Sequence, residues 1–567
     1  MEKIKEKLSK SIVTKVFLIN LIIFVICNLL FDIKYEQVDD FIIYNLYSGL
    51  DGTYNIHGVY IHPVICFIIG LFFRVLPFIN WHTIFLLLCQ LICFTIIGTI
   101  LLKKNTNRVS YLLYTLFASV FYTVLLQLIQ YTSVSALLIL TAFFIIIDMT
   151  QRNTTNRKCT ILYIILFTLG IMLRMQSLLI VVPFLALYLV YYLILKVKEN
   201  KTKQECIELL KKYIVLGMIT IVIYLSNLLI YQTDNLYEEY MEYNDMRATL
   251  HDVSYTPYEE NKEIFDEIGW SKNDHYLFYS FNFGDENVYS KENLQKIIEY
   301  KKANNEYYNL NLDIKEVEKT LIRELKNDYT YIGILFIVSF FIALYTNREK
   351  TGFIISIFIL TVFVHTLFIV LNRTMLRVVI PEYILGTAMM LYFIKYKEEK
   401  NKIDNRLKAI SIITILVTIV YVGGSYQYNY YLEDYNNYKN VINYTNEHKE
   451  NVYLYTVPSL QYRYLAYSVY EMPPKASFTN LRVMGGWDMF TQNYEDFKER
   501  YNLDGTFLDL LKEDVYLIDG DVNWSGNYYH NYIDNIVLFI KENYGKDVNY
   551  KKIETIGNIY IYKIYEE

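Results

Sequence analysis

The stretch IVTKVFLINLIIFVICNLLF at residues 12–31 decides the class of fold, because it is predominantly apolar and long enough to cross a bilayer as a helix. Lysines are frequent in the short segment that precedes it. No small-residue cleavage site accompanies the run, as one would in a secretory signal peptide. We therefore interpret it as a retained first transmembrane helix with its lysine-rich end in the cytoplasm.

Apolar runs of similar length recur along the rest of the chain. Hydrophobic residues make up 54% of the 567 residues, more than an average soluble protein contains. The further runs lie at residues 82–102, 109–129, 131–149, 159–173, 176–195, 213–231, 330–346, 351–371, 377–394 and 407–423. The sequence therefore predicts a polytopic α-helical membrane protein with about eleven transmembrane helices.

The apolar run 59–79 needs a different interpretation. Counting it as a crossing would place the basic loops that follow it on the outer face, against the positive-inside preference. Pro63 breaks the run, Arg74 interrupts it and Pro77 closes it. We expect a re-entrant or juxtamembrane segment that does not span the bilayer.

This topology puts the long polar stretches on one side of the membrane. They are the outer loops 32–81 and 232–329, within a transmembrane domain at 1–423, and a tail at 424–567. The tail alternates short apolar runs with helical stretches and closes with two runs of period two around a Gly-Asn pair. We predict that it folds as a small extracytoplasmic α/β domain.

The charge balance excludes one class of partner. The chain has 54 Lys and Arg residues against 59 Asp and Glu residues, which gives a formal net charge of −5. Such a chain has no general basic field to hold a polyanion, so we expect no nucleic-acid binding. The partner that the composition does predict is the lipid bilayer.

Charged and polar residues recur at the predicted outer ends of the helices, where each of them needs a physical reason. They are Asp39 and Asp40 in the first outer loop, Gln130, Arg174, and the pair Arg373 and Arg377. The arginines could simply reach lipid phosphates, and one aspartate could cap the next helix. A cavity that holds an anionic head group beside a general base explains both the outer cations and the carboxylate pair.

Two histidines flank the start of the segment 59–79. His57 and His62 belong to the run HGVYIHP, so either could line the same cavity. The alternative is a structural role in which each ring binds the backbone.

These features together resemble the GT-C superfamily of membrane glycosyltransferases, which use polyprenyl-phosphate-linked sugars. Protein O-mannosyltransferases, aminoarabinose transferases and oligosaccharyltransferases belong to it. The resemblance covers residues 1–423, and segment 242–290 looks like an outer-loop pattern of bacterial GT-C-like proteins. The matching residues are Tyr243, Asn244, Arg247, Asp252, Gly269, Trp270, Ser271, Asn273, Asp274, Asp285, Tyr289, Ser290 and, in the tail, the run Gly485, Gly486, Trp487 and Asp488.

The resemblance implies a hexosyl or pentosyl transferase in a bacterial plasma membrane. It would move sugar from a polyprenyl-phosphate donor to a surface glycan acceptor on the outer face, with inversion. The superfamily's first-loop carboxylate matches Asp39 or Asp40, as the general base. We assign the substrate-binding residues by predicted location and chemistry: Arg174, Arg247, Arg373, Arg377, His57, His62 and Gln130. A divalent cation could bind the carboxylate pair, although no complete oxygen cage is visible.

Other functions remain open at this point. A flippase or polymerase of lipid-linked saccharides is one, but such transporters usually show internal repeats, and none is visible here. A receptor or assembly scaffold is another, although eleven helices exceed what anchoring needs. The tail could bind the acceptor or act as a structural cap. Trp487 and Trp524 could stack on sugar rings there, although core positions are favoured for both.

Overall fold

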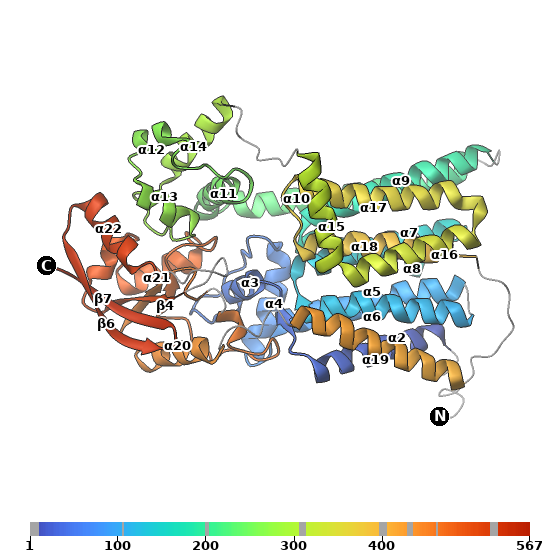
Figure 1. The fold of residues 1–567 in the computed structure, drawn as a ribbon, viewed down its shortest axis with the longest axis horizontal. Coiled ribbons are helices and arrows are strands. Elements are labelled where there is room, and N and C mark those ends of the chain that lie inside the picture. Colours follow the sequence, from blue (N-terminus) through green and yellow to red (C-terminus); the bar gives the residue numbers. More distant parts are fainter. Residues whose placement is uncertain are drawn as a thin grey trace.

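The computed structural model describes residues 11–104, 107–198, 203–304, 313–395, 405–427, 435–460, 463–521 and 531–567. The N-terminal lysines and Trp524 lie outside these ranges. Long helices form a bundle along the longest axis of the molecule, and the C-terminal sheet lies beyond one end of it (Figure 1). The helices of loop 232–329 lie at that same end, and so do α3 and α4, between the bundle and the sheet.

Each predicted apolar run coincides with a helix. These helices are α2 (Ile12–Leu30), α5 (Trp81–Lys104), α6 (Arg108–Gln127), α7 (Tyr131–Gln151), α8 (Arg157–Leu173), α9 (Leu178–Lys198), α10 (Lys203–Gln232), α16 (Thr330–Thr346), α17 (Thr351–Val370), α18 (Leu376–Phe393) and α19 (Asn405–Gln427). Within the described ranges, 8 are long and apolar enough to cross a membrane alone: α2, α5, α6, α7, α9, α10, α17 and α18. The chain is therefore a polytopic helical protein, with a smaller set of clear spans than the eleven runs suggested.

Two shorter helices lie where the bundle meets the polar regions. The run 59–79 contains only α4 (Pro63–Val75), whose 13 residues are too few to cross a bilayer. His62 caps this helix by accepting a hydrogen bond from the backbone N–H of Val64. Helix α15 (Ile314–Asn327) meets α16 at an angle of 96° and so runs across the end of the bundle.

Helix α7 is the centre of the bundle. Its membrane segment is 94% buried, whereas the corresponding segment of α10 is 11% buried and turns most of its apolar side chains outward. The contact of α7 with α8 depends on Gly170, where a Cβ atom would lie 2.7 Å from Ile139 Cγ1. Ser135 Oγ donates to the Gly170 carbonyl oxygen at 2.7 Å, a pairing of small and polar residues that is typical of membrane helices.

A two-stranded parallel ladder fixes the loop 32–81 to the bundle. Strand β1 (Lys34–Tyr35) pairs with β2 (Leu128–Ile129), which joins α6 to α7. The ladder continues into a hydrogen bond from the Glu36 N–H to the Ile129 carbonyl at 3.0 Å. The helix α3 (Asp39–Ser48) follows directly, so the ladder determines where Asp39 begins that helix.

The loop 232–329 is largely helical where it is described. It contains α11 (Asn235–Ala248), a π-helical turn (Thr249–Val253), α12 (Lys262–Glu267), α13 (Lys272–Tyr279), α14 (Lys291–Ala303) and α15. Side-chain caps start four of these helices, with Asp234 at α11 and Asp313 at α15 as two of the capping residues. Ser271 and Asp274 form a reciprocal capping box at α13, and Ser290 accepts from the N–H of Asn293 at α14.

The C-terminal region contains a five-stranded mixed sheet in the order β4-β3-β5-β7-β6. Its elements are β3 (Val452–Tyr455), β4 (Leu481–Val483), β5 (Val515–Gly520), β6 (Val548–Ile556), β7 (Ile559–Glu566), α20 (Tyr435–Glu447), α21 (Gln492–Tyr501) and α22 (Ile533–Tyr544). Strands β3, β4 and β5 are parallel, so each is joined to the next by a crossover connection, and α21 lies in the one between β4 and β5. The alternating runs at the end of the chain form the antiparallel hairpin β6–β7, turning at Gly557 and Asn558.

Polar residues of the loop 232–329 hold it against the C-terminal region. The carboxylate of Asp285 accepts hydrogen bonds from the Phe507 N–H at 2.8 Å and from the Tyr544 hydroxyl. Asp274 accepts from Asn543 Nδ2 at 2.9 Å. Asp274 and Asp285 belong to the pattern in segment 242–290. Their contacts in the structure join the loop 232–329 to the C-terminal region.

Candidate functional site

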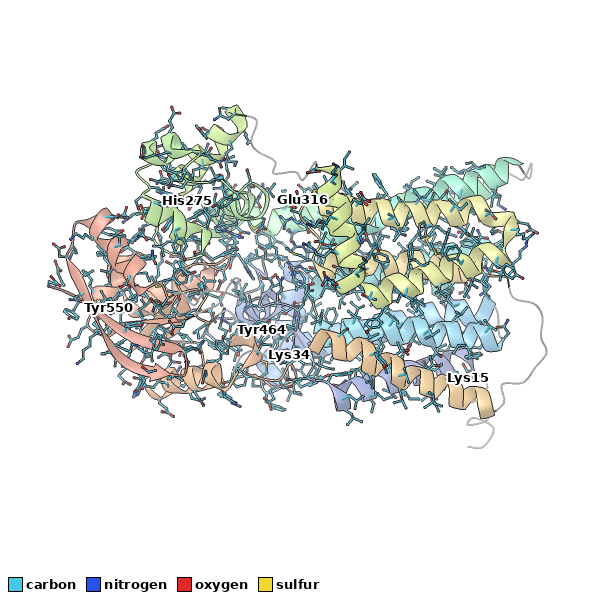
Figure 2. The ribbon with its side chains drawn as sticks, in the orientation of Figure 1. Lys15, Lys34, His275, Glu316, Tyr464 and Tyr550 are labelled. Carbon is cyan, nitrogen blue, oxygen red and sulfur yellow. The ribbon has the colours of Figure 1, made fainter. Side chains whose placement is uncertain are left out.

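The polar residues of the loop 32–81 lie at the junction of the bundle and the C-terminal region. Figure 2 shows Lys34 of this loop and Tyr464 of the C-terminal region at that junction. Asp39 and Asp40 occupy the first turn of α3, where the helix dipole favours negative charge, but neither side chain caps the helix. The two carboxylates have different surroundings.

Asp40 is fully buried and binds two neighbouring helices. Its Oδ1 accepts from His82 Nε2 of α5 at 2.9 Å and from the Tyr131 N–H at the start of α7 at 3.0 Å. The other ring nitrogen of His82 contacts the hydroxyl of Tyr47. Burial raises the pKa of Asp40, and the contact with His82 opposes this rise. The side chain therefore ties α3 to α5 and α7.

Asp39 faces the C-terminal region. Its Oδ1 accepts a hydrogen bond from Trp487 Nε1 at 3.2 Å, and its side chain is partly exposed. Trp487 belongs to the Gly485–Asp488 run, which is more than four hundred residues away in the sequence. The aspartate is thus shared between the transmembrane domain and the tail.

A third carboxylate, Glu36, lies close to both aspartates. Its Oε1 is 3.9 Å from Arg377 Nη1 and accepts a bond from the Arg377 N–H at 3.4 Å. Burial raises the pKa of Glu36 to about 7, although Arg377 opposes the rise and the charges of Asp39 and Asp40 add to it. Sequence reasoning missed Glu36, and the available signal was its position three residues before Asp39.

Arg174 is linked to the same carboxylates through Tyr131. Its Nη1 donates to the Tyr131 hydroxyl at 2.7 Å, and its guanidinium lies 4.6 Å above the ring centre of Tyr60. Among the described residues, no carboxylate lies within ion-pair distance of this guanidinium. Arg174 is partly exposed, so its charge is available to an anionic ligand.

Arg373 contacts the loop 232–329, and Arg247 belongs to it. Arg373 Nη2 is 3.7 Å from Asp252 Oδ2, in an ion pair with 34% and 43% exposure of the two side chains. Arg247 is 4% exposed and donates to Asn244 Oδ1 in the same helix. The structure thus brings Arg174 and Arg377 close to the carboxylates, and it gives the other two arginines partners in the loop.

The two histidines and Gln130 have structural partners. The His57 ring stacks on Tyr237 at 3.9 Å, and the His62 Nε2 atom is 3.0 Å from Ser226 Oγ. Gln130 caps α7 by accepting from the N–H groups of Thr132 and Ser133. These three side chains therefore position the loop and the helix that surround the site.

The carboxylates do not form a metal cage. Within the described residues, no group of three His, Cys, Asp or Glu side chains is placed to hold a metal ion. The hydrogen bonds to Asp39 and Asp40 use the Oδ1 atom of each side chain, and Asp40 Oδ2 is buried without a hydrogen-bond partner.

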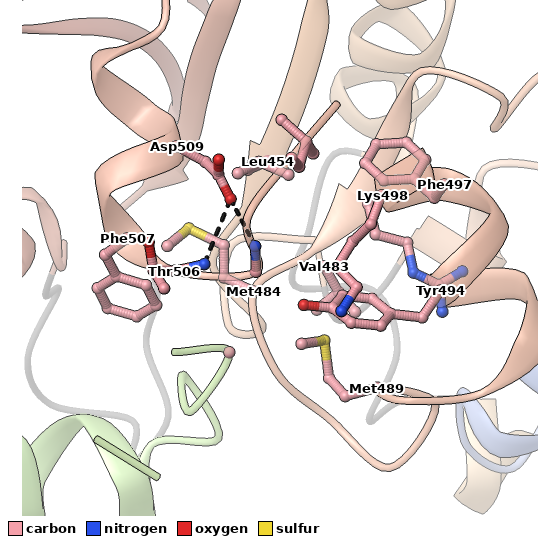
Figure 3. Close-up of a pocket in the computed structure, with 14 residues that line it drawn as sticks. Leu454, Val483, Met484, Met489, Tyr494, Phe497, Lys498, Thr506, Phe507 and Asp509 are labelled. Atoms are coloured by element: carbon pink, nitrogen blue, oxygen red, sulfur yellow. Dashed lines mark hydrogen bonds between the residues drawn. The ribbon is translucent and has the colours of Figure 1, made fainter. Parts of the chain in front are cut away.

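A small cavity, lined mainly by residues of the C-terminal region, lies next to Met484 and Met489, which flank the Trp487 turn in the sequence (Figure 3). Arg482, Met484 and Met489 line it, and it has room for about 30 Å³. This volume accommodates a water molecule but not a sugar ring. The cavity therefore belongs to the packing of the turn rather than to a substrate site.

Chemically, the junction combines carboxylates that can accept a proton with guanidinium groups that can bind a phosphate. The residues come from the first loop, the turn before α9 and the first turn of α18, which are far apart in the sequence. No family model matches the chain, and no curated protein matches it.

Proposed function

We propose that the chain is a membrane glycosyltransferase of GT-C type that moves a sugar from a polyprenyl-phosphate donor to a surface glycan or another acceptor. The observation that carries the proposal is the junction itself, where Asp39 and Glu36 lie with Arg174 and Arg377 at one end of an apolar bundle. A lipid-linked phosphate has to present its head group at such an end. We place this end at the outer face of the cell membrane, with the N-terminus in the cytoplasm.

Asp39 is the general base in this proposal. It is partly exposed, whereas Asp40 is fully buried and holds His82 and the start of α7. Asp39 removes the proton from the acceptor hydroxyl while the acceptor oxygen bonds to the anomeric carbon. The bond from that carbon to the phosphate oxygen breaks on the opposite side, so the configuration inverts. A positioned base of this kind contributes on the order of 10² to 10⁴ in rate.

Arg174 and Arg377 bind the phosphate of the donor. Negative charge grows on this phosphate as the sugar leaves, and fixed guanidinium groups stabilise it without reorganisation. Arg174 has no carboxylate partner among the described residues, so the phosphate supplies its countercharge. Arg377 is held by Glu36, and the ionised form of Glu36 competes with the phosphate for this guanidinium.

Asp39→Asn tests the proposal, with Asp32→Asn as the matched control. Asp32 belongs to the same loop, pairs with Lys34 at 3.2 Å and is 67% exposed. Both proteins are reconstituted in vesicles with a radiolabelled polyprenyl-phosphate sugar and a cell-envelope acceptor extract. Asp39→Asn should lower transfer by about 10²-fold or more, and Asp32→Asn should transfer like the wild type. Full transfer by Asp39→Asn would exclude this residue as the base.

A second candidate is proton-linked transport of a lipid-linked saccharide. His365 of α17 is 0% exposed, lies 2.9 Å from Glu324 Oε2 and 3.9 Å from Glu382 Oε1. Ionisable residues buried at membrane depth are typical of proton paths in transporters. Movement of the labelled lipid across the vesicle bilayer, without sugar transfer, would favour this alternative.

A further inference from the structure

The turn Gly485–Asp488 begins with two glycines, and at Gly485 the neighbouring backbone leaves no room for a side chain. A Cβ atom on Gly485 would lie 1.7 Å from the Phe281 carbonyl oxygen of the loop 232–329. Gly486 has a φ of +84°, which favours glycine. Next to the turn, the Met484 carbonyl accepts from the Gly284 N–H at 2.9 Å. The two glycines therefore allow the tail to insert Trp487 between the two outer loops.

Contacts on both sides fix the turn in place. Arg482 lies 3.6 Å from Asp51 of the first loop and 3.4 Å from Asp488 of the turn, and all three side chains are nearly fully buried. The hydroxyl of Tyr240, in the loop 232–329, donates to the Trp487 carbonyl at 2.6 Å. The position of the indole is therefore set by three regions of the chain at once.

The contacts of Trp487 close a ring around the carboxylate pair. Its Nε1 donates to Asp39, and its ring meets the edge of Tyr60 at 5.0 Å with an interplanar angle of 64°. Tyr60 lies under the Arg174 guanidinium, which binds the Tyr131 hydroxyl. The N–H of Tyr131 donates to Asp40, the neighbour of Asp39. The series of contacts thus starts at Asp39 and finishes at Asp40, and the peptide bond between these two residues closes the ring.

We propose that Trp487 is a positioning residue: its indole N–H orients the Asp39 carboxylate, and its ring holds Tyr60 beneath Arg174. This inference rests on the proposed glycosyl transfer. It gives the C-terminal region a part in the reaction. Without Trp487, Asp39 loses the hydrogen bond from the indole and Tyr60 loses the ring contact, so the ring of contacts is broken. The proposed base and the proposed phosphate-binding arginine then belong to a site to which the helical bundle region and the tail both contribute.

Steady-state kinetics separate the two contacts of Trp487. Trp487→Phe keeps a ring against Tyr60 and removes the N–H, so kcat should fall about 10- to 100-fold while the KM for the donor stays unchanged. Trp487→Ala also removes the support of Tyr60, so it should lower kcat and raise the donor KM. A merely structural role would lower the amount of folded protein and leave kcat per folded molecule unchanged.

Trp270→Phe is the matched control. Its indole N–H donates to the Val288 carbonyl at 2.9 Å, inside the loop 232–329. The substitution removes the same group from another buried tryptophan and should leave kcat and KM at their wild-type values. An equal fall of kcat in Trp270→Phe and Trp487→Phe would overturn the positioning role.

Fluorine NMR tests the contact without relying on activity. The chain has 4 tryptophans, so 5-fluorotryptophan labelling gives signals that substituting each tryptophan in turn assigns. Asp39→Asn should shift the Trp487 signal and leave the Trp270 signal in place. An unmoved Trp487 signal, or a shifted signal with wild-type kcat in Trp487→Phe, would overturn the inference alone. A wild-type protein without transfer activity would overturn the proposed function and the positioning role with it.

Discussion

The Asp39 side and the Asp40 side of one helical turn differ in burial and in the origin of their partners. Asp40 is fully buried and is bound by residues of α5 and α7, inside the bundle. Asp39 is partly exposed and is bound by Trp487 from the tail. Two identical side chains in adjacent positions thus have separate tasks, one in holding the helices together and one at an accessible surface. The role of each aspartate therefore depends on its burial and its partners, and not on its residue type.

Among substitutions near the partly exposed Asp39, Arg174→Gln should lower the rate of sugar transfer the most, apart from substitution of Asp39 itself. The glutamine can still contact Tyr131 but cannot neutralise a leaving phosphate, so transfer should fall about 10²- to 10³-fold. Arg373→Gln is the control, because its partner is the exposed carboxylate of Asp252. Transfer is measured per folded protein in vesicles, and equal rates for both variants would contradict the assignment of Arg174.

On the buried side, Asp40→Ala should change stability more than Asp39→Ala. It leaves His82 and the Tyr131 N–H without their acceptor in a buried place, which costs about 2 to 4 kcal/mol of unfolding free energy. Asp39→Ala loses one hydrogen bond at a partly exposed position, which costs about 1 kcal/mol. Thermal unfolding in detergent measures both. A lower stability of Asp39→Ala than of Asp40→Ala would contradict the structural role of Asp40.

The smallest expected effect is a pH dependence that involves Glu36. Burial raises its pKa to about 7, so the group is mostly neutral below pH 7 and ionised above it. The ionised form pairs with Arg377 and competes with the donor phosphate. The donor KM should therefore rise roughly two- to fivefold as the pH increases through 7, the equivalent of an ion pair of about 1 kcal/mol. Glu36→Gln should remove this rise, and a rise that persists in this variant would exclude Glu36 as its source.

Hydrophobic runs predict the helical architecture of this chain because each run carries its own signal. The residues 131–149, for example, are apolar all round, and α7 is the most buried helix of the bundle. The short length of α4 also follows from Pro63 at its start. The gathering of Asp39, Asp40, Arg174 and Arg377 at one end follows from topology, since turns on one side of a membrane share that side.

The partners of these residues could not be predicted in the same way. The pairing of β1 with β2 involves only two residues in each strand, which is too short to leave a pattern in the sequence. The hydrogen bond from Trp487 to Asp39 joins positions that no local rule relates. For the same reason the sequence left the choice between the two aspartates open, because their difference depends on His82, Tyr131 and Trp487.

Sugar transfer by Asp39→Asn and Asp40→Asn, measured side by side per amount of folded protein, distinguishes the proposed base from its buried neighbour. The labelled polyprenyl-phosphate donor and the acceptor extract are the same for both variants. Asp39→Asn should lose about 10²-fold or more of the transfer rate, and folded Asp40→Asn should lose far less. A larger loss in Asp40→Asn than in Asp39→Asn, or wild-type transfer in both, would contradict the account.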